Sequence, residues 1–148
     1  MASTPYAVNV GVASYPDIIP VTIPVFAASA IANADELTNY VPGFNFEVVK
    51  IDFVTVTPIT TGGKTATINP YIDGTAVPNG TTTALAGTQA KGVVANVWTG
   101  PGTGTVAQGT HTYGSATSKL RLVASSVTAF TEGTGYFLVQ LRNVGNLS

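Results

Sequence analysis

The sequence predicts an all-β fold, a single-domain jelly-roll-like β-sandwich preceded by an extended N-terminal arm. Its 148 residues are the size of one domain that can bury a proper core. The 16 Gly and 9 Pro, set among recurring Thr and Val, favour short strands joined by tight turns. Candidate strands recur about every 8–12 residues with scarcely a helix between them, which is the pattern of a sandwich or barrel.

The extended arm is predicted over residues 1–24, and the sandwich over residues 25–148. Four prolines fall in the arm, and each fixes φ and pushes the preceding residue into an extended conformation. The arm is too apolar for a solvated tail, so we expect it to lie along its own domain or a neighbouring copy. The candidate contact residues are Tyr6, Val8, Val10, Ile18 and Ile19.

The central strand is predicted over residues 44–57, FNFEVVKIDFVTVT, between Pro42-Gly43 and Pro58. Its apolar residues shift twice between even and odd positions. Because alternate side chains of a strand point to opposite faces, each shift places the following apolar residues on the other face of the sheet. Bulges near residues 48–49 and 53–54 would keep all eight apolar side chains inward. The alternative is a strand buried on both faces, as where a sandwich meets a neighbouring subunit.

Flanking segments supply further strands and one strong turn. Residues 21–32 read as an edge strand, with one turn of helix as an alternative near their end. Residues 64–72 read as a strand, and Asp73-Gly74 predicts a two-residue hairpin returning over residues 75–77. The apolar residues that share one face of this strand are Ala66, Ile68 and Ile72.

Later strands are predicted over residues 81–85, 91–98, 119–124 and 136–144. In the last two, period-two alternation places one set of side chains inward: Leu120, Leu122, Phe137, Val139 and Leu141. The outward set is Lys119, Arg121, Gln140 and Arg142. In residues 91–98, the same alternation places Val93, Ala95 and Val97 on one face and Val94 and Trp98 on the other.

Charge is scarce in this sequence. Charged residues make up 9%, against about 25% in a typical soluble domain, and a monomer of this mass exposes about 7,000 Å². So few charges predict a surface partly buried against other chains, hence an oligomer. The net charge of −1, without a Lys or Arg cluster, argues against a nucleic-acid or membrane partner.

Targeting and redox features are also few. No apolar run approaches the roughly 18 residues of a membrane helix, and the N-terminus lacks the pattern of a signal peptide. We therefore expect a protein made in the cytoplasm. Cysteine is absent, which excludes a disulfide framework and thiol chemistry.

Patterns that could carry catalysis are incomplete, so we predict no enzyme, cofactor or metal site. Gly63-Lys64-Thr65 imitates the end of a phosphate-binding loop, but the required earlier glycine is replaced by Pro58 and a strand follows. His111 is the single histidine, and no nucleophile-elbow sequence surrounds a serine.

Two further site hypotheses involve acids and aromatics. Glu47 and Asp52 lie on the central strand, but nominal alternation places them on opposite faces, which disfavours a glycosidase pair. An aromatic platform for sugars could form from Trp98, Tyr113 and Tyr136, although aromatics in a sandwich more often belong to its core or an interface.

Two blocks, residues 38–77 and 123–144, carry a resemblance to a known class of proteins. They contain a V-P-G-F turn, a strand ending in V-T-P-I-T-T, a K-x-A-T-I-N strand and the late run A-S-S-V-T-A-F-x-E-G-T-G. In these motifs the chain resembles small β-rich structural proteins of tailed bacteriophages. The middle of the chain, residues 81–118, departs from that pattern.

The resemblance implies a virion component, chiefly a capsid decoration or cement protein that forms trimers on the head, or a minor head or tail protein. It implies no catalytic residues. The expected partners are further copies of the chain in a homotrimer and the phage major capsid protein, at the capsid surface of the virion. The alternative is a carbohydrate-binding jelly-roll module of a phage fibre or tail.

Overall fold

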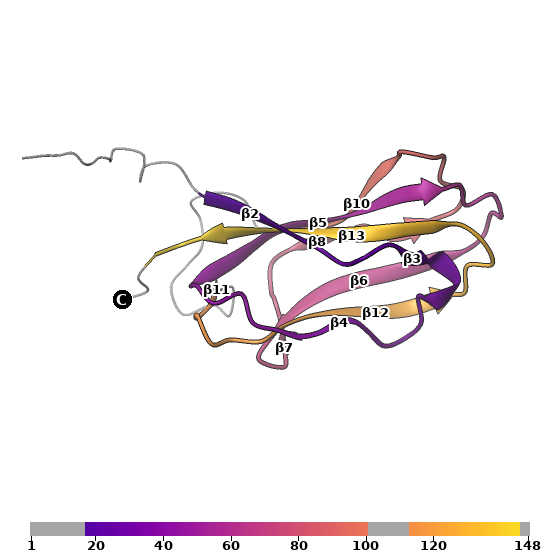
Figure 1. Ribbon diagram of the computed structural model, residues 1–148. Coiled ribbons are helices and arrows are strands. Elements are labelled where there is room, and N and C mark those ends of the chain that lie inside the picture. The colour runs from indigo at the N-terminus through magenta and orange to yellow at the C-terminus, as the bar shows by residue number, and fades with distance from the viewer. Residues whose placement is uncertain (1–16, 101–112, 146–148) are drawn as a thin grey trace, which may run out of the picture.

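The computed structural model describes residues 17–100 and 113–145, which form two antiparallel sheets packed face to face (Figure 1). This confirms the predicted all-β sandwich. The first sheet has the order β2 (Asp17–Thr22), β13 (Thr134–Asn143), β5 (Phe46–Thr57), β10 (Val94–Thr99) and β8 (Thr81–Thr82), with β11 (Tyr113–Gly114) paired to β5 and β3 (Phe26–Ala27) paired to β13. The second sheet has the order β4 (Asp35–Tyr40), β12 (Leu120–Thr128), β6 (Thr65–Ile72) and β7 (Thr75–Ala76), with β9 (Leu85–Ala86) paired to β6.

The segment predicted as an edge strand over residues 21–32 is divided. Strand β2 ends at Thr22, β3 covers two residues, and a single 3-10 turn follows at Ala28–Ala30. The alternative of one helical turn is therefore closer to the structure, although the turn is of the tighter 3-10 kind.

Strand pairing in the sandwich is nested. Strand β2 pairs with β13 and β5 with β10 in the first sheet, while β4 pairs with β12 and β6 with β7 in the second. Successive pairs thus alternate between the two sheets. Each sheet is completed by a further pairing, β13 with β5 and β12 with β6.

The core lies between the two sheets and is closed by aromatic side chains. The rings of Phe53 and Phe137 meet edge to face with centroids 5.2 Å apart, and Phe26 lies 5.6 Å from Phe137. Gly135 allows this packing because a Cβ there would lie 2.3 Å from Cζ of Phe53. The largest fully buried side chains include Trp98, Phe46, Phe53, Phe130 and Phe137.

Strand β5 is central, as predicted, and it carries two bulges. Lys50 pairs with Gln140 and Val48 with Leu141, so Val49 is the extra residue, which confirms the bulge predicted near residues 48–49. The second bulge falls at Val56, later than predicted. The expectation that all eight apolar residues face inward is wrong. The buried ones are Phe46, Val48, Ile51 and Phe53, whereas Phe44, Val49, Val54 and Val56 are half-buried.

Strand β10 carries a bulge that its sequence did not reveal. Asn96 pairs with Asp52 and Trp98 pairs with Ile51, which leaves Val97 without a partner residue on β5. The bulge turns Trp98 toward the core, so its predicted placement opposite Val97 is wrong and both are buried. Gly80 packs on the indole, because a Cβ there would lie 2.2 Å from Cζ2 of Trp98.

The predicted hairpin after β6 is confirmed. Ile72 pairs with Thr75, and both intervening residues, Asp73 and Gly74, have positive φ, as this two-residue turn requires. The apolar face predicted for β6 is also confirmed, since Ala66, Ile68 and Ile72 are fully buried.

Candidate interaction surface

Two of the five predicted contact residues lie in the described part of the chain, on strand β2. This strand pairs with β13 from Asp17 opposite Asn143 to Thr22 opposite Leu138, at the edge of the first sheet. Ile18 is 42% exposed on the outer face, whereas Ile19 pairs with the buried Leu141 and faces inward. The other three, Tyr6, Val8 and Val10, lie outside the described residues, so the structure does not bring the five together.

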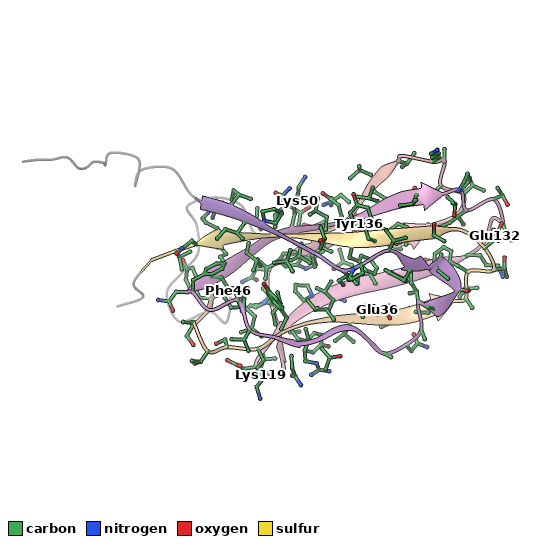
Figure 2. All side chains as sticks on the ribbon, viewed as in Figure 1. Glu36, Phe46, Lys50, Lys119, Glu132 and Tyr136 are labelled. Carbon is green, nitrogen blue, oxygen red and sulfur yellow. The ribbon has the colours of Figure 1, made fainter. Side chains whose placement is uncertain are left out.

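The outer face of the first sheet is the most distinctive surface of the described molecule. It consists of the side chains that alternate with the core residues along β2, β13, β5 and β10, and Lys50 and Tyr136 mark it in Figure 2. Its two halves differ. Toward the start of β5 it carries charged side chains, and toward the end of β5 it carries apolar ones.

The charged half contains a buried ion pair between Glu47 and Arg142. The two residues are cross-strand partners on β5 and β13, and Nη1 of Arg142 donates to Oε1 of Glu47. Glu47 is 4% exposed, and its Oε2 has no hydrogen-bond partner among the described residues. Burial raises the pKa of Glu47, and the charge and hydrogen bond of Arg142 oppose this only in part.

A second ion pair, Lys50 with Asp52, lies next along β5. Nζ of Lys50 is 3.3 Å from Oδ2 of Asp52, and Nδ2 of Asn96 on β10 donates to Oδ1 at 3.1 Å. The bulge at Val49 places Glu47 and Asp52 on the same face, so the prediction of opposite faces is wrong. Because each carboxylate is paired with its own cation, the two do not form an acid and base pair.

The apolar half is organised around a row of residues that crosses the sheet, which we call the apolar strip: Val25, Tyr136, Val54 and Val94. Tyr136 pairs with Val54, and Val54 pairs with Val94, so the three are neighbours on adjacent strands. Val94 and Val25 are 57% and 55% exposed, the highest values among the large hydrophobic residues described. The strip therefore presents apolar surface that the described chain does not cover.

A shallow hollow opens at one end of the apolar strip. It is lined by Thr22, Ile23, Pro24, Val25 and Tyr136, with a volume of about 220 Å³. Its lining carries no charged side chain. Its polar groups include the hydroxyls of Thr22 and Tyr136, and no carboxylate, histidine or lysine that could activate them is among the lining residues.

The outer face of the second sheet has a different character. Ser125 pairs with Thr67, and Arg121 lies over the ring of its cross-strand partner Tyr71 at 5.7 Å from the centroid. These side chains are half-buried, and no large hydrophobic residue of β6 or β12 is among the exposed ones. Exposed apolar surface thus concentrates on the first sheet.

The sheet edges are poor sites for pairing with another chain. Pro20 interrupts β2, and it lacks the N–H that an added strand would need. Strand β4 changes register against β12 twice, and β7 and β8 have two residues each. A partner is therefore better accommodated by the outer face than by an edge.

The aromatic platform for sugars, which was the less favoured reading of Trp98, Tyr113 and Tyr136, does not form, and the core placement favoured for these aromatics is confirmed for Trp98. Trp98 is 1% exposed, so its ring is not available to stack on a ligand. Tyr113 pairs with Glu47 at the charged half of the outer face, whereas Tyr136 belongs to the apolar strip. His111 lies outside the described residues.

Residues 17–100 and 113–145 hold no grouping of side chains that could bind a metal ion. Within these ranges, no three side chains of His, Cys, Asp or Glu lie close enough together to hold a metal ion. Thr65 begins β6, so the strand predicted after Gly63-Lys64 is confirmed, where a phosphate-binding loop would be followed by a helix. No described helix is long and apolar enough to cross a membrane.

Sequence reasoning missed a cluster of hydrogen-bond donors around one carboxylate, that of Glu132, at the far end of the sandwich. The backbone N–H groups of Thr60 and Thr61 donate to Oε2 of Glu132 at 3.0 and 2.7 Å, and both hydroxyls donate to the same oxygen. Thr131 donates its hydroxyl to Oε1. These bonds lower the pKa of Glu132 to about 2. Thr60 and Thr61 lie 72 and 71 residues before Glu132 in the sequence, so no local pattern could have brought them together with it.

Comparison with known proteins adds no relative to this picture. No protein-family model, no curated protein and no solved structure matches the chain.

Proposed function

We propose that this protein is a non-enzymatic structural component of a bacteriophage virion, a decoration protein that binds the head exterior as a homotrimer and reinforces the shell. The likeness of residues 38–77 and 123–144 to small β-rich phage structural proteins motivates the proposal. The partners are copies of the chain and the phage major capsid protein.

The strand order is consistent with a jelly roll, and we infer that fold in detail. A jelly roll arises when a long antiparallel hairpin is rolled so that successive strand pairs fall alternately in two sheets. The nested pairs of β2 with β13, β4 with β12, β5 with β10 and β6 with β7 follow that scheme.

The observation that carries the proposal is the apolar strip on a face whose charges are already paired. Monomeric proteins rarely expose contiguous apolar patches larger than a few hundred Å², and larger patches mark interaction sites, so the apolar strip is where we place a protein partner. Lys50 and Arg142 already have carboxylate partners within the chain, so binding an uncharged surface would leave neither unpaired. Burying apolar surface would contribute about 25 cal/mol per Å² before the costs of association.

Two measurements test this function. Sedimentation velocity of the purified chain at micromolar concentration should give the mass of a trimer, and a monomer would contradict the proposal. Co-sedimentation with capsids assembled from the major capsid protein of the same genome should bring the chain into the pellet. A trimer that stays in the supernatant would retain self-association but remove the capsid role.

A further inference from the structure

The turn that joins β7 to β8 holds an exposed asparagine followed by a glycine. Residues 77–80 read Val-Pro-Asn-Gly, and the turn leads into Thr81, which pairs with Thr99 at the edge of the first sheet. Asn79 has a φ of 65°, a left-handed conformation that asparagine tolerates better than most residues. The residue is exposed, so its side-chain amide is open to water.

Hydrogen bonding distinguishes Asn79 from most other asparagines. The asparagines whose side chains hydrogen bond within the chain are Asn33, Asn45, Asn69, Asn96 and Asn143. Among the residues that the structure describes, the two asparagines without a side-chain hydrogen bond are Asn39 and Asn79. Asn39 is followed by Tyr40, whereas Asn79 is followed by Gly80. Asn79 therefore combines an unrestrained amide with a following residue that has no side chain.

We propose that Asn79 is a site of spontaneous deamidation and isoaspartate formation, in which Gly80 supplies the attacking nitrogen. The backbone nitrogen of Gly80 forms a bond with Cγ of Asn79, the Cγ–Nδ2 bond breaks, and Nδ2 leaves as ammonia with the proton of the Gly80 N–H. Water, the one co-reactant, then opens the succinimide ring. Opening at the main-chain carbonyl carbon gives isoaspartate, and opening at Cγ gives aspartate. Glycine favours the attack, because it has no Cβ beside the nitrogen and the greatest backbone freedom.

The position of Gly80 gives this reaction a structural consequence. Gly80 packs on the indole of the buried Trp98, since a Cβ there would lie 2.2 Å from Cζ2. Isoaspartate adds one carbon to the main chain immediately before Gly80. Either Gly80 shifts against the indole, or β8 shifts in its pairing with β10, and a closely packed contact tolerates neither without cost. We therefore expect the modification to loosen β8 at the edge of the first sheet.

Peptide mapping of the aged full-length protein tests the site. Incubation at mildly alkaline pH promotes loss of the Gly80 N–H proton, and isoaspartate is then detected by enzymatic methylation and located by mass spectrometry. Isoaspartate should accumulate at Asn79. Asn45 should react at a rate lower by on the order of 30-fold or more, because two hydrogen bonds must break first. Equal modification of Asn39 and Asn79, or modification of Asn79 in urea but not in the folded protein, would overturn the inference.

Asn79→Gly is the matched variant for the structural consequence, because glycine keeps the positive φ and removes the amide. Aged wild type should contain a population that melts about 3 °C lower, with altered fluorescence of Trp98, whereas the aged variant should not. Isoaspartate at Asn79 without either change would refute the loosening of β8. Neither measurement depends on oligomeric state or capsid binding, so failure here leaves the proposed function in place.

Discussion

Two glutamates at opposite ends of the sandwich are stabilised in contrasting ways. Glu47 lies near the start of β5, almost fully buried, with one strong cation partner and one oxygen without a partner in the described chain. Glu132, labelled at the other end in Figure 2, receives bonds from three threonines and two backbone N–H groups. Burial raises the pKa of Glu47, whereas hydrogen bonding lowers that of Glu132.

The contrast shows that an ion pair does not guarantee that the ionised form of a carboxylate is stabilised by folding. Arg142 supplies a full charge, yet desolvation of Glu47 outweighs it. Neutral hydroxyl and amide donors at a wetter site favour the ionised form of Glu132 more strongly. We therefore expect the two residues to contribute opposite pH dependences to stability.

The largest expected effect comes from removing the partner of Glu47. Arg142→Met should lower the free energy of unfolding by about 3 kcal/mol at pH 7, because it leaves a buried carboxylate without its cation. The loss should shrink at pH 4, where Glu47 can take up a proton. Urea unfolding at both pH values measures it, and Glu47→Gln combined with Arg142→Met should recover part of the loss. An equal loss at pH 4 and pH 7 would contradict the account.

Glu132→Gln should give the next largest effect. The amide replaces an acceptor oxygen and loses bonds from the threonines, so the melting temperature should fall by about 3 °C at pH 7. Because the pKa of Glu132 is about 2 and its ordinary value is 4.5, its stabilisation is complete above pH 4.5 and is lost as the pH falls toward 2. In thermal melts between pH 2 and 7, the melting temperature of the wild type should rise between pH 2 and pH 4.5 by an amount that the Glu132→Gln variant lacks. Glu47→Gln is the control and should keep this rise.

Glu47→Gln should act mainly on the pH profile just above pH 4.5. A carboxyl whose pKa is raised in the folded state holds its proton there while the unfolded chain has lost it, so stability falls as the pH rises through this interval. The variant should remove that decline, and at neutral pH it should cost less than Arg142→Met, because the side chain of Arg142 is 15% exposed against 5% for Glu47 and a glutamine oxygen can still accept its hydrogen bond. A steeper decline in the variant would contradict the assignment.

The smallest effect is expected at Lys50. Its side chain is 40% exposed, so the ion pair with Asp52 is screened by water, and Lys50→Ala should cost about 0.5 kcal/mol. Asp52 keeps the bond from Asn96 in this variant. Chemical unfolding in low and high salt checks the expectation, since a loss as large as that of Arg142→Met would place Lys50 in a buried network after all.

Local patterns in the sequence predicted the elements that depend on neighbouring residues. Asp73-Gly74 predicted its hairpin because both residues tolerate positive φ, and the phase change of β5 predicted the bulge at Val49. The bulge at Val97 lay beyond such reasoning, because Val97 and Trp98 are both apolar and alternation alone assigns them to opposite faces.

The candidate surface was less accessible to sequence reasoning than the fold. The apolar strip joins residues from the β2–β3 link, β13, β5 and β10, and their adjacency exists only after the strands have paired. The scarcity of charge did predict that some surface meets a partner, but it could not say which face. The extended arm drew attention to Ile18 and Ile19, which the strand pairing then placed on opposite sides of β2.

The position of β13 has a consequence for biogenesis. This strand comes last among those described, yet it occupies a slot between β2 and β5, which are made much earlier. Until it emerges from the ribosome, the nascent chain holds two separated strands whose hydrogen-bonding groups and apolar sides are open to water. Strand pairing between residues so far apart in the sequence slows folding, and the unpaired strands are prone to aggregation in the meantime. Chaperone dependence should therefore be concentrated in the interval before β13 has been synthesised.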